Sequence, residues 1–191
     1  MRIIILRHGE TVENKLEVTQ GHNHGQLSEL GLKQVKKLAN YLKDEKIDLI
    51  YCSDLGRCKK SIEPLLEIIN LKAIYTPLLR ERGKGIFEGR PSKELREWSH
   101  KNPGKVPEGG ESELDVDKRV KKFLDENMNE WKGKIVLIMT HGGTKISLLK
   151  ILNKDGIAGV IPNAGITIIN IKDGEKRIEK FNYNEYLGDL K

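Results

Sequence analysis

Cysteine is scarce in this chain of 191 residues, which has only Cys52 and Cys58. Two cysteines are too few for a disulfide framework, which excludes the class of small disulfide-stapled secreted proteins. We expect Cys52 to end a strand and Cys58 to lie in the following helix, as two unlinked core residues. Met1 and Arg2 lead straight into an apolar run, without the pattern of a signal peptide, so we expect a reduced, cytoplasmic protein.

Long apolar runs and motifs for metal or nucleic-acid binding are also missing. The run Ile3–Leu6 is far too short to span a membrane. The sequence has neither the clustered carboxylates nor the Cys/His spacing of a metal site. It also has no RNP-like aromatic motif and no dense basic run, which are typical of nucleic-acid binding. We therefore expect no metal, no cofactor, no membrane and no nucleic-acid partner.

What is present is a long, mildly basic chain. Lys and Arg number 34 against 28 Asp and Glu, and the net charge of +6 favours anionic partners only slightly because the two signs are interspersed. No low-complexity linker divides the chain, and its length is sufficient for one well-buried core. We predict a single domain over residues 1–191. The sequence leaves open whether that domain forms a homodimer.

The stretch Arg7–Glu13 directly follows the buried strand expected at Ile3–Leu6. In open α/β sheets, ligands bind at the carboxyl ends of the strands. An Arg, an imidazole and a flexible Gly at such an edge suit a phosphate, because guanidinium holds two phosphoryl oxygens and imidazole can attack phosphorus. Taken alone, the stretch is explained equally well by a His8 that merely ends the strand beside a solvated Arg7.

Two later segments place further polar residues at strand ends. Asp48–Cys52 is predicted to be a strand, after which Asp54 is expected to cap a helix that carries Arg57 in its first turn and bends at Pro64. Ile135–Met139 is a further buried strand, and it ends in Thr140-His141-Gly142-Gly143 before another helix. Two histidines that each follow a strand and precede a Gly suggest imidazoles converging on one anion.

The remaining chain completes an alternation of strands and helices. Ser28 is expected to cap a helix with an apolar face formed by Leu32, Val35, Leu38, Ala39 and Leu42. We predict a short strand at residues 72–75, an amphipathic helix over 113–131, and a hairpin at Asp173-Gly174 between arms at 166–171 and 177–181.

Residues 77–112 are rich in Gly, Pro and charge, with one short helix opening at Ser92, and are predicted to form a lid. The predicted fold class is α/β. It has three α/β/α layers, a mostly parallel, doubly wound sheet with an antiparallel edge hairpin, and a small lid.

Ordered blocks in this sequence resemble the histidine phosphatase superfamily, also called the phosphoglycerate mutase-like family. The resemblance spans roughly residues 2–171, and so many blocks in the same order make a chance match very unlikely. The blocks are Arg7-His8-Gly9-Glu10-Thr11 with Asn14, Leu27-Ser28-Glu29-Leu30-Gly31, Ser53-Asp54-Leu55-Gly56-Arg57, Leu79-Arg80-Glu81-Arg82, Phe87-Glu88-Gly89, Gly110-Glu111-Ser112, Thr140-His141-Gly142-Gly143 and Pro162-Asn163-Ala164-Gly165.

The resemblance implies a metal-independent phosphomonoesterase that acts on small phosphorylated metabolites. His8 would attack phosphorus to form a phosphohistidine, and Glu81 would protonate the departing alcohol and then deprotonate a water. The residues implied to neutralise the phosphoryl oxygens are Arg7, Arg57 and His141, with help from Asn14. The implied substrate-binding residues also include Gln20, Gly21, Arg82 and Gly142.

Some alternatives stay open at this point. The residues themselves do not select Glu81 over Glu88, Glu10 or Glu13 as the proton donor. Beside Glu81, the cations Arg82 and Lys84 either hold a second anionic group of the substrate or are solvated.

The chain departs from the family pattern in one loop. Family members often read Gly-x-x-Asp-x-Pro-Leu-Ser/Thr, whereas this chain has Gly21-His22-Asn23-His24-Gly25-Gln26-Leu27-Ser28. We expect a looser loop or an altered substrate preference. His22 and His24 lie two residues apart with no carboxylate nearby, so we expect surface histidines rather than metal ligands.

Within the family, the choice lies between a phosphatase and a cofactor-dependent phosphoglycerate mutase. Mutases usually carry a longer insertion between the Glu block and the Gly-Glu-Ser block, whereas Glu81 here precedes Glu111 by only 30 residues. The compact lid favours a phosphatase, with a mutase as the alternative. A non-catalytic phosphate-binding or scaffold protein is the third interpretation, disfavoured because all the polar catalytic positions are present.

Overall fold

A six-stranded mixed sheet forms the centre of the structure. In the computed structural model, which describes residues 1–152 and 160–191, the strand order is β3-β2-β4-β1-β5-β6. In chain order the elements are β1 (Arg2–Arg7), α1 (Val12–Lys15), α2 (Glu29–Leu42), β2 (Leu49–Ser53), α3 (Gly56–Ile69), β3 (Ile74–Thr76), α4 (Ser92–Lys101), α5 (Glu113–Asn127), β4 (Ile135–Thr140), α6 (Gly142–Leu152), β5 (Ile166–Lys172) and β6 (Glu175–Tyr183). Short 3-10 helices occupy Pro77–Leu79, Gly85–Phe87, Met128–Trp131 and Glu185–Leu190.

The sheet is parallel on one side and antiparallel on the other. Strand β4 pairs in parallel with β1 and β2, and β2 pairs in parallel with β3. Strand β5 runs antiparallel to both β1 and β6. The turn between β5 and β6 has positive φ at Asp173 (51°) and Gly174 (84°), as a two-residue type I′ hairpin turn requires. The predicted mostly parallel sheet with an antiparallel hairpin is confirmed.

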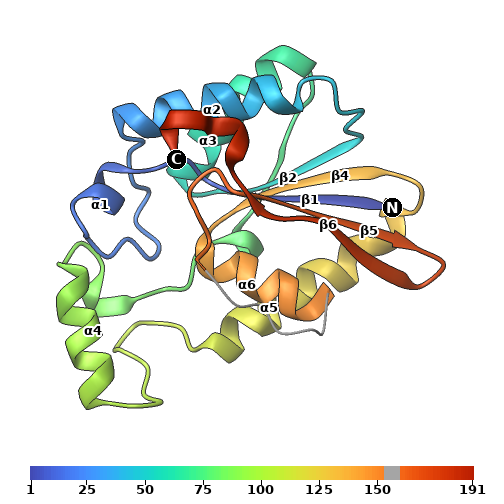
Figure 1. The fold of residues 1–191 in the computed structure, drawn as a ribbon. Helices are drawn as coiled ribbons and strands as arrows, with labels where there is room; N and C mark the ends of the chain where they lie inside the picture. Colours follow the sequence, from blue (N-terminus) through green and yellow to red (C-terminus); the bar gives the residue numbers. More distant parts are fainter. Residues whose placement is uncertain (153–159) are drawn as a thin grey trace.

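Helices cover both faces of the sheet, as Figure 1 shows, with α2 and α3 on one face and α5 and α6 on the other. Strand β1 is buried on both faces because its apolar side chains alternate between two cores. Ile3 and Ile5 pack with the residues of α5 and α6, whereas Ile4 and Leu6 pack with those of α2 and α3. Each such buried side chain stabilises the fold by about 1.5–3 kcal/mol, which fixes β1 and hence the residues that follow it.

The carboxyl ends of three parallel strands meet at one edge of the sheet. Arg7 at the end of β1 is in register with Thr140 at the end of β4, and the backbone N–H of His8 donates to the carbonyl of Thr140 (3.1 Å). Strand β2 ends beside them at Ser53. Helices α1 and α4 lie at this edge, away from the N-terminus (Figure 1). The polar residues that follow each strand are thereby brought together.

The structure differs from the sequence predictions around Asn14 and Asp54. The segment expected as a loop around Asn14 contains the short helix α1, because Thr11 and Asn14 form a reciprocal capping box. Asp54 does not cap α3. The N-cap residue is Leu55, which makes no side-chain capping bond, and the Asp54 carboxylate instead pairs with Arg80 (Nη2 to Oδ2, 2.6 Å).

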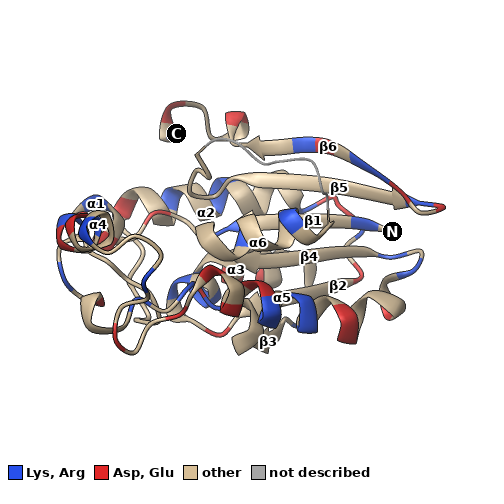
Figure 2. Cartoon of the chain, turned by 90° about the horizontal axis from the view of Figure 1, so that it is seen from below, with Lys and Arg blue, Asp and Glu red and all other residues tan. Residues whose placement is uncertain are grey.

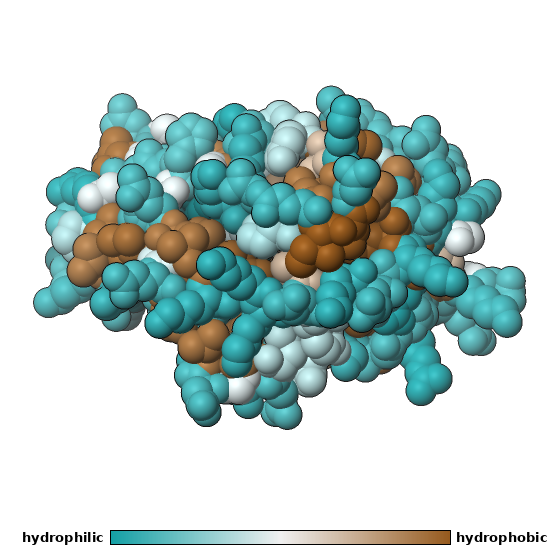
Figure 3. Space-filling model, turned by 90° about the horizontal axis from the view of Figure 1, so that it is seen from above, coloured by the Kyte–Doolittle hydropathy of each residue, from teal (hydrophilic) through white to brown (hydrophobic). Residues whose placement is uncertain are grey.

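Figures 2 and 3 show how charged and apolar residues are distributed. Figure 2 shows Lys and Arg interspersed with Asp and Glu on α5, where Lys121 pairs with Asp125 at i,i+4 spacing. Figure 3 shows separated hydrophobic areas among hydrophilic residues on the face that α2 and α3 cover. Leu32 of α2, predicted for the core, is 49% exposed, because it lies off the buried face formed by Val35, Leu38 and Leu42. None of the helices in residues 1–152 and 160–191 is long and apolar enough to cross a membrane.

Candidate active site

His8 is held in one orientation at the end of β1. Its side chain is buried, and its Nδ1 atom lies 2.8 Å from the carbonyl oxygen of Gly9. Because a carbonyl can only accept, Nδ1 carries the proton and the lone pair is on Nε2. Burial, together with the positive charges of Arg57 and Arg7, holds the pKa of His8 well below its usual value. The imidazole is therefore neutral and has an unprotonated nitrogen.

Arg57, in the first turn of α3, is the central cation of the site. Its Nε–H lies 3.3 Å from Nε2 of His8 and 3.1 Å from Nδ1 of His141. Its two terminal nitrogens donate to the backbone carbonyls of Gly21 (2.9 Å) and Asn23. Arg57 therefore joins the ends of β1 and β4 to the loop that begins at Gly21.

His141 lies directly beneath Arg57. The rings of His8 and His141 meet edge to face, with their centroids 5.2 Å apart. Since Nδ1 of His141 accepts from Arg57, its Nε2 carries the proton and faces the hydroxyl of Ser53 (2.8 Å). Burial and the charge of Arg57 lower the pKa of His141 well below its usual value. His141 is thus neutral here, and its two ring nitrogens contact Arg57 and Ser53.

Both cysteines are free and buried, as predicted. The thiol of Cys58 lies 3.3 Å from Nε2 of His141 and donates weakly to the carbonyl of Thr140 (3.4 Å). Burial raises the pKa of this thiol to about 12. Cys58 therefore packs behind the site as an uncharged thiol.

Arg7 is anchored by the segment Ile161–Gly165. Its Nη1 donates to the carbonyl of Ile161, and its backbone N–H donates to the carbonyl of Gly165. Its Nε is buried and has no hydrogen-bond partner within residues 1–152 and 160–191. A buried N–H without a partner is costly, so this donor marks a place where an anion would be stabilised.

A cavity of ≈ 400 Å³ opens in front of His8, within the usual range for sites that bind small molecules. Of the predicted residues it is lined by Arg7, His8, Asn14, Gln20, Gly21, Arg57, Glu81 and Arg82. Two predicted residues are not on its wall. His141 is fully buried next to Arg57, and in place of Gly142 the cavity is lined by its neighbour Gly143, whose N–H donates to Glu81.

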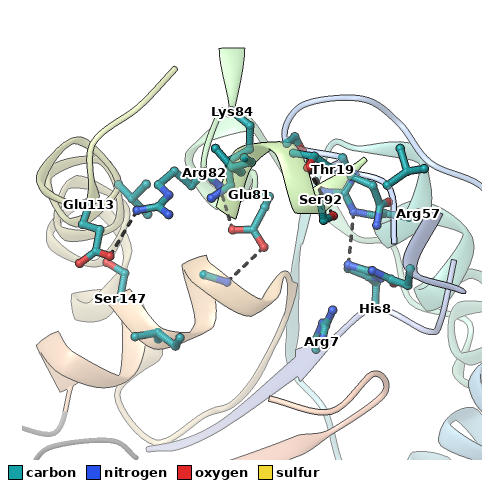
Figure 4. Close-up of a pocket in the computed structure, with 18 of the residues that line it drawn as sticks. Arg7, His8, Thr19, Arg57, Glu81, Arg82, Lys84, Ser92, Glu113 and Ser147 are labelled. Atoms are coloured by element: carbon teal, nitrogen blue, oxygen red, sulfur yellow. Dashed lines mark hydrogen bonds and ion pairs between the residues drawn. The ribbon is translucent and has the colours of Figure 1, made fainter. Parts of the chain in front are cut away.

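Glu81 lies between the two halves of this cavity. Figure 4 places it between the group formed by Arg7, His8 and Arg57 and a second group that includes Arg82 and Glu113. Its carboxylate accepts from the backbone N–H groups of Arg82 (2.8 Å) and Gly143 (3.1 Å). A Cβ atom on Gly143 would lie 2.4 Å from Oε1 of Glu81, so a side chain there would displace the carboxylate.

The other three candidate acids are engaged elsewhere. Glu88 accepts from the backbone N–H groups of His22 (3.0 Å) and Lys84 (2.8 Å), which ties the two loops together. Glu10 accepts from the hydroxyl of Ser28, and Glu13 accepts from the backbone of Gln26. None of these three carboxylates lines the cavity within the described ranges, whereas Glu81 does. The geometry therefore favours Glu81 among the four.

A partly buried ion pair contacts the backbone of Glu81. Arg119 of α5 donates to Glu111 (3.0 Å) and, through Nη2, to the backbone carbonyl of Glu81 (3.0 Å). His22 contacts the same carbonyl (2.9 Å) and lies 3.4 Å from Glu111. His22 is therefore a partly exposed histidine, as expected, that also links the loop after Gly21 to Glu81 and Glu111.

His24 replaces a missing helix cap. Its Nδ1 accepts from the backbone N–H of Gly56 (3.1 Å), at the start of α3, and its carbonyl accepts from the N–H of Arg57 (2.9 Å). Although His24 is exposed as expected, it performs the capping that the family's Asp at this position could provide. His24 departs from the family pattern, but its two contacts still hold the first turn of α3 in place.

Several functional contacts come from residues without a predicted role. Asn163 donates through its side-chain amide to the carbonyl of His8 (3.1 Å) and to Oδ1 of Asn14 (3.2 Å). Asn163 belongs to the recognised block Pro162-Asn163-Ala164-Gly165. That block marked Asn163 as a residue shared with the family, but it did not predict which residues Asn163 contacts. Ser53 stands in a recognised block too and Arg119 in none, but no local pattern specifies their contacts with residues as distant in sequence as His141 and Glu81. Within residues 1–152 and 160–191, no group of three or more His, Cys, Asp or Glu side chains could hold a metal ion.

The chain is similar to known proteins in both sequence and structure. The family model of the histidine phosphatase superfamily (branch 1) matches residues 3–184. The chain is 29% identical over 199 residues to a metal-independent phosphoserine phosphatase of Arabidopsis thaliana, and the match covers 98% of this chain and 84% of that protein.

Solved structures show the same fold. A phosphoglycerate mutase from Bacillus anthracis superimposes with a TM-score of 0.88 at 25% identity, covering 100% of this chain and 96% of that one. A mycobacterial glucosyl-3-phosphoglycerate phosphatase in complex with VO3 superimposes with a TM-score of 0.84 at 27% identity, covering 96% of this chain and 99% of that one. The predicted α/β fold is confirmed.

Proposed function

The chain belongs to the histidine phosphatase superfamily, branch 1, and on this premise we propose that it is a metal-independent phosphomonoesterase acting on small phosphorylated metabolites through a phosphohistidine. The observation that carries the proposal is the state of His8. Its Nδ1 proton is held by the Gly9 carbonyl, its pKa is depressed, and its unprotonated Nε2 lies at the wall of a small-molecule cavity between two arginines. A neutral imidazole held in one tautomer is the form that can attack phosphorus.

The reaction would proceed in two displacements. In the first, Nε2 of His8 attacks phosphorus, the bond from phosphorus to the ester oxygen breaks, and protonated Glu81 gives its proton to the departing alcohol. In the second, the Glu81 carboxylate takes a proton from a water whose oxygen attacks phosphorus. The bond from nitrogen to phosphorus then breaks, which releases inorganic phosphate and leaves Glu81 protonated again. Splitting the reaction in this way replaces one difficult step by two easier ones.

The phosphoryl oxygens would be bound by the cations around His8. Arg7 supplies a buried Nε–H without a partner among the described residues, and Arg57 supplies the Nε–H that now faces the two imidazoles. Asn14 uses its Oδ1 for the backbone N–H of Thr11 and for Asn163, which leaves its amide N–H groups as donors. Two arginines can supply the charge that a metal ion provides in other phosphoryl-transfer enzymes.

The segment 77–112 is the part that we propose to act as a lid. It supplies Glu81, Arg82 and Lys84 to the cavity, and α4 adds Ser92 and Leu95. The similarity to a phosphoglycerate mutase supports a mutase as the alternative function, because the two chains share one fold over their full lengths. The short lid supports the phosphatase.

An assay of phosphate release separates these functions. We expect the purified protein to hydrolyse p-nitrophenyl phosphate and small phosphate esters equally well with and without excess EDTA. A mutase would instead convert 3-phosphoglycerate to 2-phosphoglycerate only when 2,3-bisphosphoglycerate is added. Complete loss of phosphatase activity in EDTA, restored by Mg²⁺ or Zn²⁺, would contradict a metal-independent mechanism.

A further inference from the structure

The cavity in front of His8 continues beyond Glu81 into a second cationic region. Apart from Arg7, Arg57 and Glu81, the charged residues of its wall are four cations, Arg82, Lys84, Arg96 and Lys150, and two carboxylates, Glu113 and Asp117. Figure 4 shows Lys84 and Arg82 close to Glu81, on the side away from Arg7. A substrate whose phosphoryl group is at His8 would therefore extend towards this region.

Three of these four cations lie within ion-pair distance of a carboxylate of the protein. Arg82 pairs with Glu113 (3.2 Å), and Lys150 lies 3.8 Å from the same carboxylate. Arg96 pairs with Glu17 (3.1 Å). Lys84 is the exception, because its amine makes no ion pair and no hydrogen bond in the part of the chain that the structure describes. Asp117 does not compensate it, since Asp117 accepts from the hydroxyl of Ser147.

Lys84 is also fixed and partly removed from water. Its backbone N–H donates to Glu88 (2.8 Å), which holds the start of the 3-10 helix Gly85–Phe87. Its half-buried side chain lies at a junction, because it lines both the cavity in front of His8 and an adjoining cavity of ≈ 430 Å³. Burial and the charge of Arg82 lower the pKa of Lys84, whereas Glu81, Glu113 and Glu88, none of them within ion-pair distance, favour its charged form.

We propose that Lys84 binds a carboxylate of the substrate, so that the site selects phosphate monoesters that carry a carboxylate over esters of the same size that lack one. This inference rests on the proposed function, since it assumes that the phosphoryl group is bound at His8. A carboxylate is favoured over a second phosphoryl group because one unpaired ammonium balances one negative charge. Lys84 is favoured over Arg82 because the guanidinium of Arg82 is already paired with Glu113.

The test compares the binding of 3-phosphoglycerate and glycerol 3-phosphate, which differ by a carboxylate against a hydroxymethyl group. Calorimetry on His8→Asn, which cannot form the phosphoenzyme, measures binding of both without turnover. We expect 3-phosphoglycerate to bind about 10-fold more tightly, as one charge-assisted contact can provide. The double variant His8→Asn/Lys84→Met should lose this preference, and His8→Asn/Lys84→Arg should retain most of it.

A matched control removes a lysine outside the cavity. Lys93 of α4 pairs with Glu97 and does not line either cavity, so His8→Asn/Lys93→Met should keep the full preference at the same net charge as Lys84→Met. The proposal is overturned if His8→Asn shows no preference, or if Lys84→Met weakens both ligands equally. Hydrolysis by the wild-type protein is measured separately. If the wild-type protein hydrolyses no phosphate ester, the proposed function is wrong. The binding preference for 3-phosphoglycerate would still show whether Lys84 binds a carboxylate.

Discussion

The Nε atom of Arg57 lies 3.3 Å from Nε2 of His8, so a fixed cation donates to the same lone pair that would attack phosphorus. This contact has two consequences. It disfavours protonation of His8, because a second proton on the ring would meet the guanidinium charge. The hydrogen bond must also break when substrate binds. A phosphoryl oxygen can then accept the Arg57 N–H in place of Nε2 of His8.

The first prediction separates the role of Glu81 from that of Arg57. A general acid matters in proportion to how poor the leaving group is, whereas an arginine stabilises the transferred phosphoryl group whatever is leaving. Glu81→Gln should slow phosphoenzyme formation from an alkyl phosphate by about 10²–10⁴-fold but much less from p-nitrophenyl phosphate. Arg57→Ala should slow both comparably, by roughly 3–4 kcal/mol of barrier.

Single-turnover kinetics are needed for this comparison, because Glu81 is also proposed to activate water in the second step. Glu88→Gln is the matched control, since Glu88 carries the same carboxylate but ties two loops together instead of lining the cavity. Equal losses on both leaving groups in Glu81→Gln would point to another proton donor.

The second prediction concerns the cap that His24 provides to α3. His24→Ala should remove the acceptor for the Gly56 N–H and destabilise the protein by about 1 kcal/mol, the usual value for a lost N-cap. His24→Asp should restore the stability, because a carboxylate both accepts this bond and suits the positive end of a helix. Urea unfolding at pH 7.5 measures both. If His24→Ala is as stable as the wild type, the contact does not act as a cap.

The third prediction is a loss of stability as the pH falls from about 6.5 to 5. Folding lowers the pKa of both His8 and His141 well below 6.5, so in this range the unfolded chain binds protons that the native protein does not. Each histidine therefore contributes up to about 1.4 kcal/mol of destabilisation per pH unit. Urea unfolding of wild type and His8→Asn should give a pH slope that is smaller by about half in the variant. Identical slopes would show that His8 is not buried in its neutral form.

The fourth prediction concerns Lys145, a fully buried residue of α6 whose amine donates to the carbonyl of Gly165 (2.9 Å). Burial and the charge of Arg7 lower its pKa from 10.5 to about 7. Between pH 7 and 10.5 the unfolded chain binds a proton that the native protein lacks, so stability should rise with pH across this window and be lost as the pH falls through it.

Lys145→Met keeps an unbranched side chain that is only one atom shorter and removes its titration. The variant should lack this part of the slope, which is up to about 1.4 kcal/mol per pH unit in the wild type. Chemical unfolding at pH 7, 8 and 9 compares the two proteins. Parallel pH dependences would mean that Lys145 is paired or solvated in the native state.

Strand periodicity was sufficient to predict the sheet and the edge at which the site forms. The apolar runs Ile3–Leu6 and Ile135–Met139 are buried on both faces, and such runs are short, unbroken and bounded by charge, so they are easily recognised. The hairpin was equally clear, because Asp173-Gly174 is a typical type I′ turn. Helix α1 was missed because only four residues form it, and a capping box with Asn at its third position is a weaker signal than one with Glu or Gln.

The sequence was sufficient to expect which residues lie together at the candidate site, but not which hydrogen bonds and ion pairs join them. Arg7, His8 and Arg57 line one cavity with Glu81, as the recognised blocks suggested. The ion pair of Glu111 with Arg119 and the contacts of Asn163 join residues that are far apart in sequence or belong to loops, and no local pattern specifies such partners. The prediction that Asp54 caps α3 failed for the same reason. Its position before α3 suggested a cap, but the nearby guanidinium of Arg80 competes for the carboxylate.

The central claim is that Nε2 of His8 becomes phosphorylated, and trapping the phosphoenzyme tests it most directly. Enzyme mixed with ³²P-labelled substrate and quenched without acid should carry an acid-labile, base-stable label. This label should be absent in His8→Ala and present in His100→Ala, a matched change on the exposed face of α4. His8→Ala should also lower kcat/KM by at least about a thousandfold, as expected when a nucleophile is removed. A label that persists in folded His8→Ala, or undiminished turnover by that variant, would contradict the account.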